Sequence, residues 1–117
     1  MGNLLARSAG NLFWLGRYLE RIENLARTIE ITETFSRDSS ASNWLSVVQI
    51  NADEKRFFEK HEVADAPSVI GFYMLDPDNP TSVPTSLQAA HQNARALRPI
   101  LSIEMWEQVN EIGRAHV

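Results

Sequence analysis

The stretch SAGNLFWLGRYLERIENLAR, residues 8–27, has the apolar spacing of an amphipathic α-helix. At the helical period its apolar side chains, with the residues that follow, fall in one broad arc: Leu12, Leu15, Tyr18, Leu19, Ile22, Leu25, Ala26 and Ile29. The pattern predicts one helix from about Asn3 or Ser8 to Phe35, with this arc packed against other helices.

The remaining positions of this helix carry alternating charges, which are Arg17, Glu20, Arg21, Glu23 and Arg27. Glu20 follows Arg17 by three residues and Glu23 precedes Arg27 by four, so opposite charges meet on the helix surface. One interpretation is a solvated face that contributes little to stability. The other is a polar seam between helices, in which arginines hold carboxylates in bidentate contact.

Three shorter helices are predicted after a polar break at residues 37–43. The first is 44–50, capped by Asn43; its apolar residues would also suit a strand, but nothing nearby offers a pairing strand. The second is 52–62, capped by the segment Asn51-Ala52-Asp53-Glu54 and anchored by Phe57 and Phe58. The third is a largely buried helix capped by Asp65, with Pro67 in its first turn. The prolines and turn residues of DPDNPTS, residues 76–82, then predict a loop.

A last long helix is predicted from Ser82 or Thr85, either of which can cap it, to about Ile112. Pro99 removes one of its hydrogen bonds, so the helix should kink there or split in two. Residues 113–117 do not continue the helical pattern and are treated as a tail. The sequence therefore predicts an all-α helical bundle over residues 1–112, with two long helices flanking two or three short ones.

Glu104 gives the charged residues a possible structural role. The polar stripe of the last helix contains His91, Arg95, Arg98 and Ser102. Glu104 instead projects with the apolar side, where an unpaired buried carboxylate would be costly, and Arg17 or Arg21 is its natural partner. The alternative is that the bend at Pro99 turns Glu104 to solvent. The pairing favours an inter-helix polar seam made of Arg17, Glu20, Arg21, Glu23, Arg27, Arg95, Arg98 and Glu104.

Composition argues against several function classes. The chain has 117 residues, of which 44% are hydrophobic and 22% are charged. Its net charge is −4 and its basic residues are interleaved with acidic ones, which argues against nucleic acid as a partner. The absence of cysteine rules out disulfides, thiolate zinc sites and a cysteine nucleophile, and it fits a cytoplasmic location. No stretch is long and apolar enough for a membrane span, and no signal peptide is evident, so no membrane partner is expected.

Metal and cofactor motifs are also lacking. The histidines, His61, His91 and His116, show no metal-ligand spacing. Asp76, Asp78 and Asn79 resemble a calcium loop only superficially, because the glycine and the distal glutamate of an EF-hand are missing. No phosphate loop and no serine elbow is present, so no metal and no cofactor is expected. The tryptophans are interpreted as core or interface anchors: Trp14, Trp44 and Trp106.

Three blocks of sequence, in order, resemble the bacterial alpha-E family, a helical domain named for a Glu-Arg motif. The first is NLFWLGRYLERIENLAR at 11–27, in which Glu20-Arg21 matches the motif. The others are ADAPSVIGFYMLDPDNPTSV at 64–83 and NARALRPILSIEMWEQVNEI at 93–112, whereas the middle at 37–62 is less specific. Gly16 and Pro99 depart from the pattern without touching the motif. Members of the family are longer, so the chain looks like the N-terminal portion of a larger helical protein.

The resemblance implies a scaffold or partner domain that acts with an ATP-grasp-type ligase or a transglutaminase-like protein in bacterial peptide synthesis or modification. The alternative is an enzyme of peptide modification in which Glu20 or Glu104 serves as acid or base in a polar cleft, beside Arg17, Arg21 and Arg95. A mutually satisfied internal network favours the scaffold, and a solvent-reachable cleft favours the enzyme. Apolar helix faces left exposed in a portion of a larger protein also predict self-association.

Overall fold

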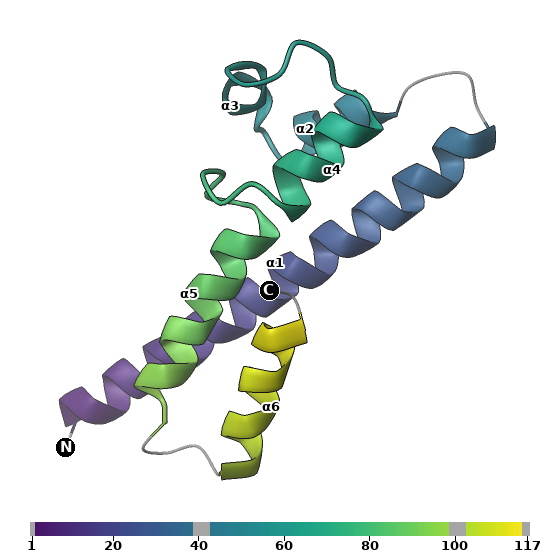
Figure 1. Ribbon diagram of the computed structural model, residues 1–117. Coiled ribbons are helices and arrows are strands. Elements are labelled where there is room, and N and C mark those ends of the chain that lie inside the picture. Colours follow the sequence, from purple (N-terminus) through teal and green to yellow (C-terminus); the bar gives the residue numbers. More distant parts are fainter. Residues whose placement is uncertain (1, 39–42, 99–102, 116–117) are drawn as a thin grey trace.

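The computed structural model describes the backbone of residues 2–38, 43–98 and 103–115, and the side chains of residues 6–37, 43–98 and 107–115. These residues form helices and connecting turns, which confirms the predicted all-α fold (Figure 1). The helices are α1 (Gly2–Asp38), α2 (Trp44–Ile50), α3 (Glu54–Phe58), α4 (Ala66–Met74), α5 (Val83–Ala96) and α6 (Ile103–Ala115).

Helix α1 is the spine of the molecule. Its 37 residues extend for about 55 Å at the rise of an α-helix, close to the 57 Å length of the whole chain. Helix α5 packs along the N-terminal half of α1, and α2 and α4 pack on its C-terminal half (Figure 1). Helix α6 folds back beside α5.

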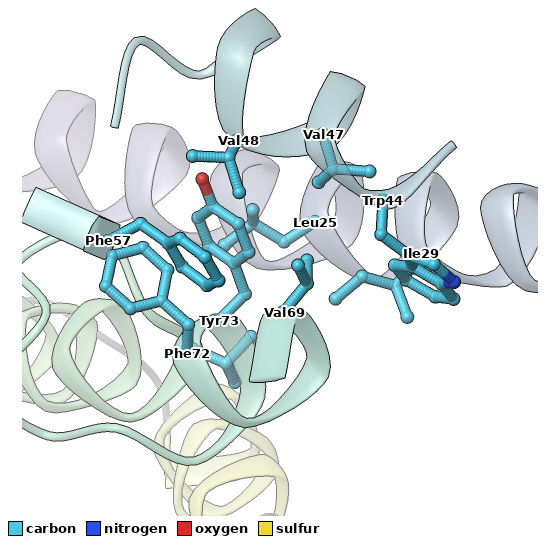
Figure 2. Packing of buried hydrophobic residues seen from close by; sticks show 10 residues of the cluster. Leu25, Ile29, Trp44, Val47, Val48, Phe57, Val69, Phe72 and Tyr73 are labelled. Atoms are coloured by element: carbon cyan, nitrogen blue, oxygen red, sulfur yellow. The ribbon is translucent and has the colours of Figure 1, made fainter. Parts of the chain in front are cut away.

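The described side chains form two hydrophobic cores, and the larger one lies against the C-terminal half of α1 (Figure 2). Five helices contribute its buried side chains, which are Leu25, Ile29, Trp44, Val47, Val48, Phe57, Val69, Phe72, Tyr73 and Val83. The aromatic rings pack edge to face, with 5.2 Å between the centroids of Phe57 and Phe72. Phe57 is therefore a core anchor as predicted, but the Phe58 side chain is 43% exposed because it projects from the other side of the short α3.

The smaller core lies against the N-terminal half of α1 and contains Leu15, Ala90, Ala94 and Leu97. Of the predicted apolar arc, Leu15, Leu25 and Ile29 are buried. Leu12 and Leu19 are 56% and 37% exposed, and Ala26 is exposed as well, so the prediction is wrong for these three. At this end of α1, helix α5 packs on Leu15 and leaves Leu12 and Leu19 exposed.

The predicted caps are confirmed for two helices. Asp65 Oδ1 accepts the Ser68 N–H at 3.0 Å, the Asp65 N–H donates to Ser68 Oγ, and Pro67 occupies the first turn of α4. The Ser68 N–H lowers the pKa of the Asp65 carboxyl from its usual value. At the start of α5, Ser82 Oγ accepts the Thr85 N–H at 3.3 Å, so Ser82 is the cap. Neither Asn43 nor Asp53 caps its helix through the side chain, contrary to prediction.

Two helix boundaries differ from the predicted ones. Helix α3 covers Glu54–Phe58 and is shorter than predicted at both ends; it cannot begin at Ala52, because Ala52 adopts a positive φ of 56° that an α-helix does not contain. Helix α6 continues through Ala115, so the prediction that the helical pattern ends at Ile112 is wrong. One glycine, Gly113, costs a helix only about 1 kcal/mol, and Gly113 is half-buried beside α5.

The predicted last long helix is split in two. Helix α5 ends at Ala96 and α6 begins at Ile103, so of the two predicted effects of Pro99 the split is found. Pro99 itself lies outside the described residues. Within the part of the chain that the structure describes, no helix is long and apolar enough to cross a membrane.

Candidate functional site

The Glu20-Arg21 pair lies beside an open groove of about 450 Å³ between α1 and two turns of the chain. One wall is a face of α1 that contributes Trp14, Arg17, Glu20, Arg21, Asn24, Leu25 and Thr28. The opposite wall contains Asn51, which follows α2, and Thr81, which precedes α5. This volume falls in the range of about 300–1,000 Å³ that is typical of small-molecule sites.

The charges of α1 pair with one another along the helix. Arg17 Nη1 lies 3.6 Å from Glu20 Oε2, and Arg27 Nη2 donates to Glu23 Oε1 at 2.6 Å. These four side chains are 59–67% exposed. The expected burial in an inter-helix seam is therefore wrong for them, because α2, α4 and α5 pack on other sides of α1. Exposed pairs of this kind contribute about 0–1 kcal/mol each.

Arg21 differs from the other arginines of α1. Its side chain is half-buried, and its guanidinium carbon lies 5.6 Å from the centroid of the Tyr18 ring. No carboxylate among the described side chains lies within ion-pair distance of Arg21. A guanidinium held against an aromatic face keeps its edge donors available for a planar anion.

The opposite wall rests on a buried carboxylate. Asp53 is 4% exposed, and its Oδ2 accepts hydrogen bonds from the Tyr73 hydroxyl at 2.7 Å and from Thr81 Oγ1 at 3.2 Å. Arg56 Nη1 donates to Asp53 Oδ1 at 3.0 Å, which pairs the charge. Burial and the neighbouring Asp53 raise the pKa of the Tyr73 phenol far above its usual value, so Tyr73 stays a donor. The network fixes Thr81 at the edge of the groove.

The loop of residues 76–82 completes this wall. Asn79 is 1% exposed, its Nδ2 donates to the Phe72 carbonyl at 3.0 Å, and its Oδ1 accepts the Thr81 N–H at 3.1 Å. The sequence predicted a loop here, which is confirmed, but not that a buried asparagine would fasten the loop to α4. An Asx-type asparagine between two prolines is a signal that could have suggested it.

The turn that carries Asn51 contains a strained residue. Ala52 has φ 56° in the left-handed region, where a residue with a Cβ costs about 1 kcal/mol or more. Its neighbour Asn51 lines the groove and donates from Nδ2 to the Val47 carbonyl at 2.8 Å. Its other neighbour is the buried Asp53. Periodicity and capping rules gave no sign of this conformation, since alanine is a helix-favouring residue.

The predicted site residues of the last two helices lie outside this groove. Arg95 is exposed on α5, and its Nη2 lies 3.4 Å from Nδ1 of His91. His91 Nε2 in turn lies 3.0 Å from Oδ1 of Asn110, which links α5 to α6. Arg98 is exposed in the turn after α5. The side chain of Glu104 lies outside the described residues. Of the predicted residues whose side chains are described, the groove therefore brings together Arg17, Glu20 and Arg21.

The acidic loop holds a lysine. Lys60 Nζ lies 3.3 Å from Asp76 Oδ2 and 3.2 Å from Asp78 Oδ2. The two carboxylates, Asp78 foremost, raise the pKa of the Lys60 ammonium. No group of three or more potential metal-ligating side chains is present among the described residues.

The tryptophans differ in environment. Trp44 is 5% exposed in the larger core, whereas Trp14 is 50% exposed at the groove. Trp14 packs against its neighbours on α1, with its ring centroid 5.5 Å from Phe13 and 5.9 Å from Tyr18. The side chain of Trp106 lies outside the described residues.

Comparisons with known proteins identify relatives of the whole stretch. A family described as a predicted alpha-helical domain with a conserved ER motif matches residues 4–116. Uncharacterised proteins of Mycobacterium bovis and Mycobacterium tuberculosis are each 29% identical over 126 residues, covering 93% of this chain and 14% of the relative. A further uncharacterised M. tuberculosis protein is 28% identical with the same coverage. The chain thus spans about 14% of the length of these relatives. No solved structure matches it.

Proposed function

The chain belongs to the alpha-E family, and we propose that it is a helical partner domain that acts with an ATP-grasp-type ligase in bacterial peptide synthesis or modification. One observation carries the partner role. The exposed aromatic residues Phe13 and Trp14 of α1 lie next to the charged motif residue Arg17, which gives this face the composition of a protein interface. The family resemblance supports an ATP-grasp-type ligase as the partner.

The surroundings of the groove support a protein-binding surface. Leu12, Phe13 and Trp14 are each at least 50% exposed in consecutive positions of α1. Arg17 lies next to them, with its guanidinium carbon 5.2 Å from the centroid of the Phe13 ring. Exposed aromatic residues beside arginines are typical of the residues that dominate binding energy at protein interfaces. The Phe13 and Trp14 rings contact each other edge to face, with 5.5 Å between their centroids, so part of this exposed aromatic surface is continuous.

A second candidate is that the full-length protein is an enzyme of peptide modification. The openness of the groove favours this candidate, since a solvent-reachable cleft is what an enzyme needs. Glu20 would be the acid or base. Against it, the Glu20 side chain is 66% exposed and paired with Arg17, whereas catalytic sites exclude water. Arg95, expected in the same cleft, is not among the residues that line the groove.

Site-specific photo-crosslinking of the full-length protein in its own cells tests the proposal. A crosslinking amino acid at Asn24, inside the groove, should capture an ATP-grasp-type ligase, identified by mass spectrometry. The same amino acid at Glu33, exposed on α1 but outside the groove lining, is the matched control and should not capture it. Absence of such a ligase at Asn24, or equal capture from both positions, overturns the proposal.

The enzyme candidate has its own test. Purified full-length protein is incubated with amino acids, short peptides and ATP, with and without the captured ligase, and the products are followed by mass spectrometry. A product formed without the ligase and lost in Glu20→Gln establishes the enzyme. A product that needs the ligase and survives Glu20→Gln establishes the partner role.

A further inference from the structure

The groove has a local excess of positive charge on an acidic molecule. The described residues of its lining include two arginines and one glutamate, while the chain as a whole carries a net charge of −4. The cations are thus concentrated where the surface is concave, and a concave wall of low dielectric strengthens their field. Such a groove attracts anions.

Arg21 is held ready to bind an anion. Its guanidinium stacks on Tyr18, and no described carboxylate pairs with it. Arg17 lies 3.6 Å from Glu20, which is an ion-pair distance longer than a hydrogen bond, so its donors are not saturated by that contact. Two guanidinium groups four positions apart on one helix face can both reach one oxyanion.

The rest of the groove limits the ligand to a small molecule with an apolar part. The volume of about 450 Å³ fits a molecule of small-ligand size rather than a folded chain. Trp14 presents a half-exposed indole to the groove. Among the described residues, the far wall consists of the uncharged Asn51 and Thr81, and Thr81 is held in place by its hydrogen bond to Asp53.

We infer that Arg21, assisted by Arg17, binds the oxyanion of a small molecule, a carboxylate or a phosphate, whose apolar part packs on Trp14. The inference builds on the proposed function, because it names the ligand class of the same groove. Glu20 faces the same groove and would keep Arg17 positioned at the anion. The ligand would be delivered to, or received from, the partner that covers the groove.

Nuclear magnetic resonance of the 117-residue chain tests the inference. The Trp14 indole N–H, assigned with Trp14→Phe, is followed while inorganic phosphate or succinate is added at constant ionic strength, which removes the effect of screening. A saturable shift is expected with at least one of them. Saturation by phosphate alone assigns a phosphate ligand, and saturation by succinate alone assigns a carboxylate.

Matched arginine variants locate the site. Arg21→Gln should weaken binding about tenfold or more, because it removes charge-assisted hydrogen bonds. Arg27→Gln should leave it unchanged, because Arg27 is paired with Glu23 and does not line the groove. Absence of a saturable shift with both anions, or equal weakening in the two variants, overturns the inference. A loss of anion binding that leaves crosslinking at Asn24 intact would overturn this inference alone.

Discussion

The two halves of α1 face different surroundings. In the C-terminal half, Leu25 and Ile29 are 5% and 7% exposed in a core built from five helices. In the N-terminal half, Leu15 is buried against two alanines and a leucine of α5 and its turn. The apolar residues Phe13 and Trp14 beside it remain 56% and 50% exposed.

This difference separates the stabilising part of the molecule from the part available for binding. The larger core buries large aromatic side chains, and burial of apolar area is the main favourable term in folding. The smaller core leaves one side of the helix uncovered. The groove with Arg17 and Arg21 lies where the two halves meet, so a rigid half holds one of its walls.

The largest expected loss of stability comes from a substitution in the larger core. Phe57→Ala should lower the free energy of unfolding by about 3–5 kcal/mol, because Phe57 is fully buried and its removal leaves a cavity among the aromatic rings. Phe58→Ala is the control, since Phe58 is 43% exposed, and it should cost less than half as much. Chemical denaturation measures both. Equal losses would mean that α3 is not anchored as described.

A smaller effect is expected from overpacking the smaller core. Ala94→Leu should cost about 1–3 kcal/mol, because Ala94 is fully buried between α5 and α1. Ala96→Leu places the same side chain at an exposed position of α5 and should change stability little. Thermal melting of the two variants compares them. A tolerated Ala94→Leu would show that α5 does not pack closely on the N-terminal half.

A gain in stability is expected from a substitution at Ala52, in the strained turn of the groove wall. Ala52→Gly should raise the free energy of unfolding by up to about 1 kcal/mol, because glycine adopts positive φ without the Cβ clash. The same change at Ala9, an exposed helical position of α1, should lower it by about 0.5–1 kcal/mol. Denaturant titration measures whether each substitution raises or lowers the free energy of unfolding. A loss at both positions would contradict the left-handed conformation of Ala52.

The helices were predictable because local patterns determine them. The period of α1, the Asp65-Pro67 cap of α4 and the helix-breaking effect of Pro99 each follow from a few neighbouring residues. The predicted all-α fold is confirmed for the same reason. The prediction that the whole apolar arc is buried was wrong, because burial depends on contacts between helices that are distant in sequence. The position of α5 decides which part of the arc is covered, and the periodicity of α1 does not determine that position.

The groove was only half predictable. The α1 wall was visible as a set of charges, but the spacing fitted both a solvated face and a buried seam, since both place opposite charges three or four residues apart. The far wall was not predicted, because Asp53 joins Tyr73 and Thr81, which lie 20 and 28 residues further along the sequence. The left-handed Ala52 has no local signature.

The central claim is that the Glu-Arg motif is a binding surface and not a structural seam. The double variant Glu20→Gln with Arg21→Gln tests it through the free energy of unfolding from denaturant titration. The exposed pairing of Glu20 and the aromatic stacking of Arg21 predict a change within about 0.5 kcal/mol. A loss of about 3–5 kcal/mol, as expected when a buried charge network is broken, would contradict the claim.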